Sequence, residues 1–341
     1  MQFAWRVTAL EDKIVQGAVA ETLSAIYEVD FLGFSYGFRP GRNPHQALSS
    51  LHTAIMSQRV NWVFDADIRS FDSVDHEWLL RMLAHRVADP RVLRLVRMWL
   101  EAGILKSDEW HETDRGTPQG AGISPLLANV FLHYALDLWV HQWRGRHTHG
   151  RVLIVRYADD VVMGFEKVAD AERMLADLKE RLAKFGLSLH EDKTRLIEFG
   201  RLPALARRQR SGRRPGTFAF PGFTHSCGWT RDGRFIVKRK TQSQRLTRKL
   251  KALRQEASRH MHATLAEQHR WYSSILSGHY GYYGVSHNFP ALSAFHGEVR
   301  RIWLWCLRRR SQKARCLNWD RFSAMLERFP LPDPKITHPG Q

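Results

Sequence analysis

The feature that most constrains the fold is a pair of adjacent aspartates between two short apolar runs. Residues 152–156 and 161–165 have the composition of strands, and the tetrapeptide 157–160 between them ends in Asp159 and Asp160. Two such runs joined so closely predict a β-hairpin with both carboxylates at its bend. Like charges side by side repel, and a fold tolerates them best where a cation neutralises them. The hairpin is therefore a candidate cation site.

A third aspartate, Asp67, ends another apolar run at residues 62–68, which is also expected to be a strand. A carboxylate at a strand end is common and often only caps or is solvated, and Tyr-x-Asp-Asp by itself is a weak signal. Three aspartates on adjacent strands can nevertheless hold two Mg²⁺ ions, which activate an attacking hydroxyl and steady a leaving pyrophosphate. Phosphoryl transfer needs little beyond positioning and charge neutralisation.

A glycine-rich segment at residues 116–129 lies between Asp67 and the aspartate pair. Gly120 and Gly122 permit close backbone approach, Gln119 can hydrogen-bond a base or sugar edge, and Ser124 followed by proline begins a helix. An ordinary helix start does not explain so many special residues at this place.

The remaining periodicity predicts intermixed helices and strands without a regular βαβ repeat, which indicates an α+β fold. The expected helices are residues 12–28, 45–56, 75–86, 90–102, 124–143, 169–185, 241–260, 267–286 and 291–311, with a hairpin at 104–113 and a strand at 193–199. Residues 201–215 are rich in arginine and are expected to be a mobile basic loop. We expect a domain boundary near residue 240.

The charge balance indicates a polyanionic partner, because Lys+Arg 52 against Asp+Glu 34 leave a net charge of +18. The surplus is concentrated in residues 231–251, where basic residues adjoin aromatics and continue into a helix. Phosphate contacts of this kind give salt-sensitive affinity for nucleic acid. Only three cysteines occur, without C-x-x-C spacing, and no signal peptide or membrane span is recognised, so a cytoplasmic location without membrane contact is expected.

These motifs, in this order, resemble the reverse transcriptases encoded by group II introns, the retron-type RNA-directed DNA polymerases with a maturase domain. The matching stretches are residues 10–16, 35–42, 67–68, 116–129, 156–160, 186–190, 193–194, 220–223 and 278–283. The resemblance implies a right-hand polymerase palm with partial fingers at residues 1–240, an all-helical thumb or maturase domain at 241–315, and a C-terminal tail at 316–341.

The resemblance also implies roles for individual residues. The catalytic carboxylates would be Asp67, Asp159 and Asp160, which would hold two Mg²⁺ ions, or Mn²⁺ as a substitute, together with the carbonyl of Ile68. The nucleotide pocket would include Ile68, Phe71, Gln119, Gly120 and Lys193. RNA or primer contacts would come from Arg39, Arg42, Gly222, Phe223, Lys238, Arg239, Lys240, Arg245, Arg248 and Lys249. The implied partners are the group II intron RNA, an RNA template with a DNA primer, deoxynucleoside triphosphates and target DNA.

Two departures from the family keep a second hypothesis open. The chain begins at about the second block of the family's fingers, so an N-terminal truncation is expected. The family usually has two aromatics before an aspartate after the first catalytic Asp, whereas here only Phe71 precedes Asp72. Either Phe71 or Asp72 then takes the place of the sugar gate. The first hypothesis is RNA-templated DNA synthesis with a role in intron splicing and mobility, and the second is an RNA-binding maturase that assists splicing without polymerising.

Overall fold

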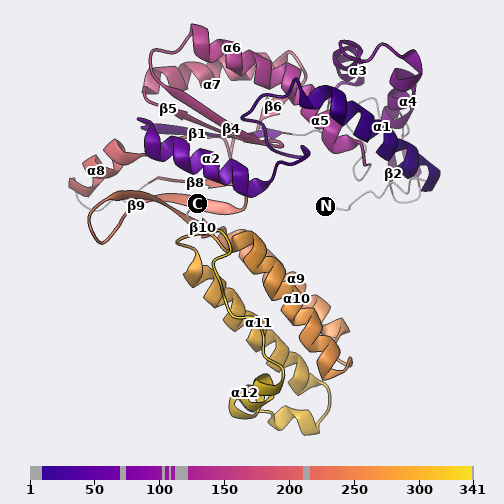
Figure 1. Ribbon diagram of the computed structural model, residues 1–341, viewed down its shortest axis with the longest axis vertical. Coiled ribbons are helices and arrows are strands. Elements are labelled where there is room, and N and C mark those ends of the chain that lie inside the picture. The colour runs from indigo at the N-terminus through magenta and orange to yellow at the C-terminus, as the bar shows by residue number, and fades with distance from the viewer. Residues whose placement is uncertain are drawn as a thin grey trace. The chain divides into compact units, whose positions relative to one another are not determined.

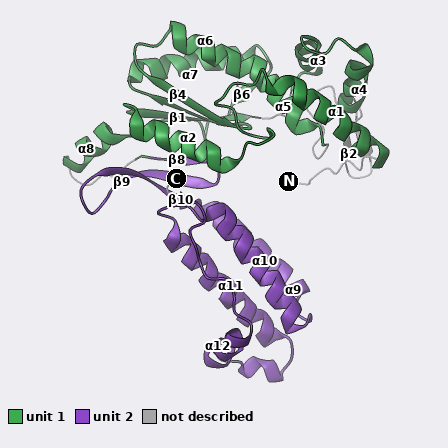
Figure 2. Cartoon of the chain, viewed as in Figure 1, with its two compact units in different colours: residues 1–216 green, residues 217–341 purple. Residues whose placement is uncertain are grey.

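The computed structural model describes residues 10–69, 74–101, 104–106, 109–111, 122–209 and 216–339 (Figure 1). The chain forms two compact units, residues 1–216 and residues 217–341 (Figure 2). In the part of the chain that is described, no helix combines the length and the apolar character that crossing a membrane requires.

The first unit is organised around an antiparallel sheet with the strand order β4-β5-β1-β6, in which β7 also pairs with β1. The strands are β1 (Trp62–Arg69), β4 (Val152–Tyr157), β5 (Asp160–Phe165), β6 (Ser188–Leu189) and β7 (Arg195–Glu198). The hairpin predicted around the aspartate pair is confirmed as β4 and β5, and β1 lies beside β5. The sheet therefore brings the two aspartate-bearing segments onto neighbouring strands.

Helices surround this sheet in the first unit. They are α1 (Leu10–Glu28), α2 (Pro44–Ser57), α3 (His76–Ala84), α4 (Pro90–Glu101), α5 (Ser124–Leu132), α6 (Leu138–Arg146), α7 (Val168–Ala183) and α8 (Arg201–Gln209), and a short hairpin joins β2 (Ile104–Lys106) to β3 (Glu109–His111). In this set, α7 packs against β1 and β5, and α2 packs along β4. One apolar core joins α1, α3, α4, α5, α6 and α7 to the sheet, with Leu83, Val130, Met163 and Leu178 almost fully buried.

The long helix expected at residues 124–143 is present but is not regular throughout. A π-helical turn, His133–Asp137, separates α5 from α6. Such turns insert one extra residue into the helical hydrogen-bond pattern and often occur near functional sites. Here the turn ends at Asp137, whose carboxylate is completely buried in the polar cluster described below.

The expectation of a mobile loop at residues 201–215 is wrong for residues 201–209, which form helix α8. The arginine-rich composition was misleading, because Ala204 is buried and Arg207 donates a 2.6 Å hydrogen bond to Glu198 on β7. These contacts hold the helix against the sheet. Residues 210–215 lie outside the described residues.

The second unit combines a small antiparallel sheet with helices. The sheet has the order β10-β9-β8 and contains β8 (Thr217–Phe220), β9 (Phe223–Trp229) and β10 (Phe235–Thr241). The helices are α9 (Ser243–Arg259), α10 (Leu265–Tyr283), α11 (Phe289–Arg309), the 3₁₀ turn η3 (Lys313–Cys316) and α12 (Trp319–Arg328). Their shared core includes Leu253, Leu276, Phe295 and Trp303.

The contact boundary between the units lies at residues 216 and 217, before the boundary expected near 240 from composition. The small sheet belongs to the second unit because side chains connect it to the helices. Asn288 accepts a hydrogen bond from the backbone N–H of Thr241 at 2.9 Å, and the Tyr282 hydroxyl donates to the carbonyl of Pro221 at 3.0 Å. The division of the chain into palm with fingers, thumb and tail stays a prediction.

The segment 316–341 that was expected to be a tail contains helix α12, and the chain after it is irregular but attached. The backbone N–H of Thr337 donates to the carbonyl of Gly284 at 2.8 Å, and the Tyr280 hydroxyl donates to the carbonyl of Pro332. This segment is therefore part of the second unit's packing.

Candidate active site

Strand register places Asp67 directly opposite Asp160. The antiparallel pairing of β1 with β5 runs from Trp62 opposite Phe165 to Asp67 opposite Asp160. Residues directly opposite in an antiparallel pair extend their side chains from the same face, with Cβ atoms about 4.5–5.5 Å apart. Asp159 is exposed at the bend one residue earlier. Folding thus brings together carboxylates from two distant parts of the sequence.

Lys193 lies at the same place. Its ammonium group is 2.6 Å from Oδ2 of Asp67, and the two side chains are 58% and 27% exposed. The turn that carries Lys193 is held to β1, because the N–H of His190 donates to the carbonyl of Asp67 at 2.9 Å, and the N–H groups of Lys193 and Thr194 both donate to the carbonyl of His190. Like charges directly opposite on a sheet destabilise it, and Lys193 offsets that repulsion on Asp67.

The bend of the hairpin is held by an adjacent loop. Ala158 has φ 57°, in the left-handed region that favours glycine. Residues 34–36 run beside the end of β4, where the N–H of Tyr36 donates to the carbonyl of Arg156 and the N–H of Arg156 donates to the carbonyl of Phe34, both at 2.9 Å. A Cβ on Gly37 would lie 2.3 Å from the backbone N of Ala158. Only glycine therefore allows this loop to approach the bend so closely.

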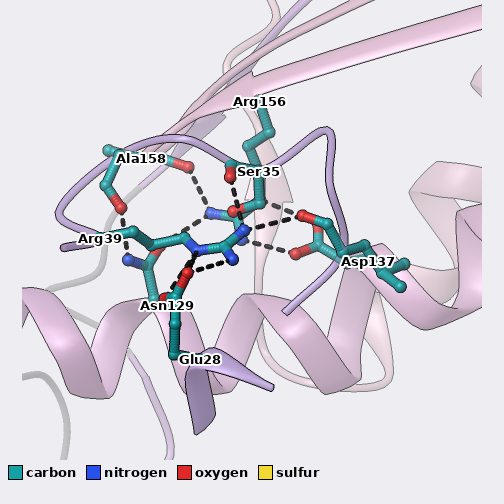
Figure 3. Close-up of polar contacts among 9 residues, drawn as sticks. Glu28, Ser35, Arg39, Asn129, Asp137, Arg156 and Ala158 are labelled. Atoms are coloured by element: carbon teal, nitrogen blue, oxygen red, sulfur yellow. Dashed lines mark hydrogen bonds and ion pairs between the residues drawn. The ribbon is translucent and has the colours of Figure 1, made fainter. Parts of the chain in front are cut away.

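A cluster of buried polar side chains also holds the bend in place (Figure 3). The Arg156 guanidinium donates to Asp137 at 2.8 and 2.5 Å, to Oδ1 of Asn129 at 3.1 Å and to the carbonyl of Ala158 at 2.9 Å. Asn129 in turn donates to the carbonyl of Gly37 at 2.6 Å. The cluster thus connects α5 and the π-helical turn to the loop at Gly37 and to the hairpin bend at Ala158.

The roles of Asn129, Asp137 and Arg156 were missed by the reasoning from sequence. A signal was present, because Asn129 and Asp137 interrupt an otherwise apolar helix, and an arginine directly precedes the Tyr-Ala-Asp-Asp tetrapeptide. Buried polar residues are hydrogen-bonded with few exceptions. Three of them at such positions could have been paired with one another.

Arg39, the expected template contact, is buried in hydrogen bonds near its own loop, so the expected contact stays a prediction. Arg39 is 6% exposed, and its guanidinium donates to Glu28 and to the carbonyls of Leu32 and Ser35 at 2.8 Å. These bonds stabilise the loop that contacts the bend, as Figure 3 shows. Arg42, by contrast, is exposed, with its guanidinium 5.3 Å from the centre of the Tyr36 ring.

Several expected pocket residues cannot be placed. Phe71, Gln119 and Gly120 lie outside the described residues, as does Asp72, so the position of the sugar gate stays a prediction. Ile68 is buried and paired with Leu189 on β6, and its expected metal contact likewise stays a prediction.

The aspartates fit a divalent cation by their chemistry. Carboxylate oxygens are the ligands that Mg²⁺ prefers, and the register of β1 and β5 sets two carboxylates opposite each other. Within the residues that the structure describes, however, no three or more His, Cys, Asp or Glu side chains gather closely enough to hold an ion. The donor set is therefore suitable, but its side chains are not assembled around a metal position.

Some of the expected RNA-contacting residues in the second unit are exposed and others are buried. On β10 the difference follows from the alternation of side chains between the two faces of the strand. On β10, Lys238 and Lys240 are exposed on one face, whereas Arg239 on the other is fully buried. No nitrogen of the Arg239 guanidinium has a hydrogen-bond partner among the described residues, and burial lowers its pKa to about 10. Arg239 is therefore not available to RNA in this conformation, because successive strand residues point to opposite faces.

The remaining basic candidates lie on α9. Arg245 and Arg248 are exposed. Lys249 is half-buried instead, with its ammonium group 3.2 Å from Nδ1 of His279 and 5.3 Å from the centre of the Phe295 ring. Burial lowers the pKa of Lys249. Arg245 and Arg248 thus face solvent, whereas Lys249 is engaged by the core.

The expected primer-gripping turn is held by two tyrosines of α10. Gly222 has φ 83°, and a Cβ there would lie 3.3 Å from Tyr282 and 3.4 Å from the Tyr283 hydroxyl. Phe223 is fully buried and stacks with Tyr282 at a centroid distance of 6.0 Å. The Phe223 ring is therefore a core side chain, and a primer contact at this turn would have to come from its backbone.

The chain is similar to known proteins over most of its length. The model of the family described as reverse transcriptase (RNA-dependent DNA polymerase) matches residues 3–225. The group II intron-encoded protein LtrA of Lactococcus lactis subsp. cremoris is 39% identical over 137 residues, which are 40% of this chain and 22% of LtrA. Protein YkfC of Escherichia coli strain K12 is 33% identical over 187 residues, covering 46% of this chain and 49% of YkfC. The chain thus spans less than half the length of either relative.

A solved structure shares the fold. Apo telomerase from Candida tropicalis superposes with a TM-score of 0.50 at 11% identity, over 92% of this chain and 52% of that chain. At so low an identity the likeness concerns the fold alone. Together with the family match, it confirms the α+β polymerase palm expected from the sequence.

Proposed function

The chain belongs to the reverse transcriptase (RNA-dependent DNA polymerase) family, and from that premise we propose that it synthesises DNA on an RNA template with Asp67, Asp159 and Asp160 as its catalytic carboxylates. The observation that carries the proposal is the register of β1 and β5, which sets Asp67 opposite Asp160 beside the bend that bears Asp159. Phosphoryl transfer depends mainly on positioning and on neutralisation of charge. A rigid sheet that presents carboxylates on one face supplies the positioning.

Members of this family use divalent metal ions, and we propose two Mg²⁺ ions here, with Mn²⁺ as a substitute. Asp67, Asp159 and Asp160 would hold them, and Ile68 would contribute its carbonyl. When bound, the ions supply charge neutralisation and an activated primer hydroxyl. Lys193 would bind the phosphates of an incoming deoxynucleoside triphosphate once Asp67 has a metal partner, and its exposure beside Asp67 supports this role.

We also propose that the natural partner is the RNA of a group II intron, which the protein would help to splice and to copy at a target DNA. Two observations support this role. The relative LtrA is a group II intron-encoded protein, and the second unit exposes Lys238, Lys240, Arg245 and Arg248. Each such cation that meets a phosphate makes the affinity more salt-dependent.

The polymerase proposal is tested by primer extension. The purified chain, given a DNA primer on an RNA template, Mg²⁺ and deoxynucleotides, is expected to extend the primer, and D159N is expected to abolish extension. D192N is the matched control, because Asp192 is an exposed aspartate on the neighbouring turn, and it should leave extension unchanged. If the unmutated chain binds RNA in a salt-sensitive way but extends nothing, the second hypothesis, a maturase that does not polymerise, replaces the first.

A further inference from the structure

The second unit contains a pocket that the polymerase function does not use. It has a volume of about 490 Å³ and is lined by Arg301, Leu304, Trp305, Arg308 and Trp319. The first four are spaced i, i+3, i+4 and i+7 on α11, so they form one face of that helix, and Trp319 is the first residue of α12. The volume lies within the range of about 300–1,000 Å³ that is usual for small-ligand sites.

The lining is aromatic and cationic. None of the five lining residues is acidic, and further arginines surround them: the Arg300 guanidinium is 5.1 Å from the centre of the Trp319 ring, and those of Arg254 and Arg309 are 4.4 and 4.9 Å from that of Trp305. The nearby carboxylate of Glu298 pairs with Arg301. Positive charge therefore remains in excess around the two indole rings.

The position of Trp319 is set by local hydrogen bonds. Asn318 caps α12 by accepting from the N–H of Arg321 at 3.0 Å. Arg308 donates through Nε to the carbonyl of Leu317 at 2.6 Å, which ties the end of α11 to the chain just before α12. Trp319 remains 41% exposed although it also contacts Phe322. An exposed indole held in place in this way loses little conformational entropy when a ligand stacks on it.

We propose that this pocket binds an unpaired nucleotide, whose base stacks on Trp319 and whose phosphates contact Arg301 and Arg308. Base stacking on aromatic side chains combined with basic phosphate contacts is how proteins hold single-stranded nucleic acid, and sequence-specific RNA recognition relies on such splayed bases. The inference rests on the proposed RNA-binding role, to which it adds a site at α11 and α12. An acidic peptide would satisfy the arginines but would leave the indole without a planar partner.

The test is photo-cross-linking of the full chain to a single-stranded ten-nucleotide RNA that contains 4-thiouracil, without primer or deoxynucleotides, followed by mass spectrometry of the peptides. An adduct is expected within residues 302–321. W319A should reduce it at least about five-fold, the lower end of what stacking of one base contributes. W319F should retain most of it, and R301Q should weaken the adduct and make what remains less salt-sensitive, because one phosphate contact is lost. F289A is the matched control, because Phe289 is an exposed aromatic at the other end of α11.

Several outcomes decide the proposal. An oligonucleotide of the same sequence in DNA shows whether the pocket distinguishes the two sugars, and cross-linking with either supports it. Adducts found only elsewhere in the chain, an unchanged yield in W319A, or equal competition by polyglutamate and by unlabelled RNA would each overturn it. Because the reaction includes no polymerisation, a chain that cross-links here but does not extend a primer refutes only the polymerase, and the reverse result refutes only this pocket.

Discussion

The carboxylate of Asp137 accepts two hydrogen bonds from the guanidinium of Arg156, at 2.8 and 2.5 Å, and neither side chain has any exposed surface. The same guanidinium donates to the carbonyl of Ala158, between Tyr157 and the two adjacent aspartates. Charge compensation inside the unit is thus coupled directly to the position of the bend that bears Asp159 and Asp160.

Removing one charge of the Asp137–Arg156 pair is expected to lower the stability of the first unit. D137N leaves the Arg156 guanidinium buried without its counter-ion, and breaking a buried pair in this way typically costs about 3–5 kcal/mol. We expect a clearly lower urea midpoint for the first unit and a loss of primer extension. E77Q, which breaks an ion pair between exposed side chains, should leave the midpoint within error. An equal shift in both variants would contradict the assigned role of Asp137.

A second prediction concerns Gly37, where the loop closely approaches the hairpin bend. In G37A the new methyl group would lie 2.3 Å from the backbone N of Ala158, so the loop or the bend has to move. We expect primer extension to fall by at least about ten-fold, because small displacements of reacting groups can reduce rates by larger factors than this. G33A is the control, since a Cβ on Gly33 meets nothing within 4 Å. Equal activity of the two variants would refute the positioning role of Gly37.

A third prediction concerns the effect of the buried Arg239 guanidinium on stability. It has no hydrogen-bond partner among the described residues, and a buried polar group without a partner costs about 1–3 kcal/mol. R239M is therefore expected to raise the denaturation midpoint of the second unit, whereas K238M, on the exposed face of the same strand, should not raise it. A lower midpoint for R239M would mean that the guanidinium is compensated in solution, for example by a bound anion.

A fourth prediction concerns how His279 makes the stability of the second unit depend on pH. Burial, together with the charge of Lys249, lowers its pKa from 6.5 to about 3. The unfolded chain therefore binds a proton between these two values and the folded chain does not, so stability is lost as the pH falls from about 6.5 toward about 3. One such group contributes a slope of up to about 1.4 kcal/mol per pH unit.

H279Q removes the titration and keeps an acceptor for Lys249. Urea midpoints of the second unit, followed between pH 7 and pH 4, should therefore depend less steeply on pH in H279Q than in the unmutated chain. Parallel curves for the two proteins would show that His279 does not remain neutral in the folded state.

Reasoning from sequence succeeded where the relevant interactions are local. The hairpin around Asp159, the basic helix that became α9 and the strand ending near Asp67 follow from apolar periodicity over a few residues. Periodicity was applied less well to residues 238–240, which were treated as one basic surface. A strand alternates its faces, and the buried apolar positions Phe235 and Val237 on β10 already placed Arg239 on the inner side.

By itself, the sequence determined the family, the α+β class, the three aspartates and the excess of positive charge, because each is written in residue types at short spacing. Only the tertiary structure decided that Asp67 faces Asp160, that Lys193 lies beside Asp67, and that Arg39 and Arg156 are buried in hydrogen bonds to the loop and to the bend. Those facts depend on strand register and on which polar groups are buried together. Strand register and shared burial are set by packing between segments that are distant in the sequence. Lys193 and Asp67, for example, are more than one hundred residues apart. No local pattern of residues encodes such contacts.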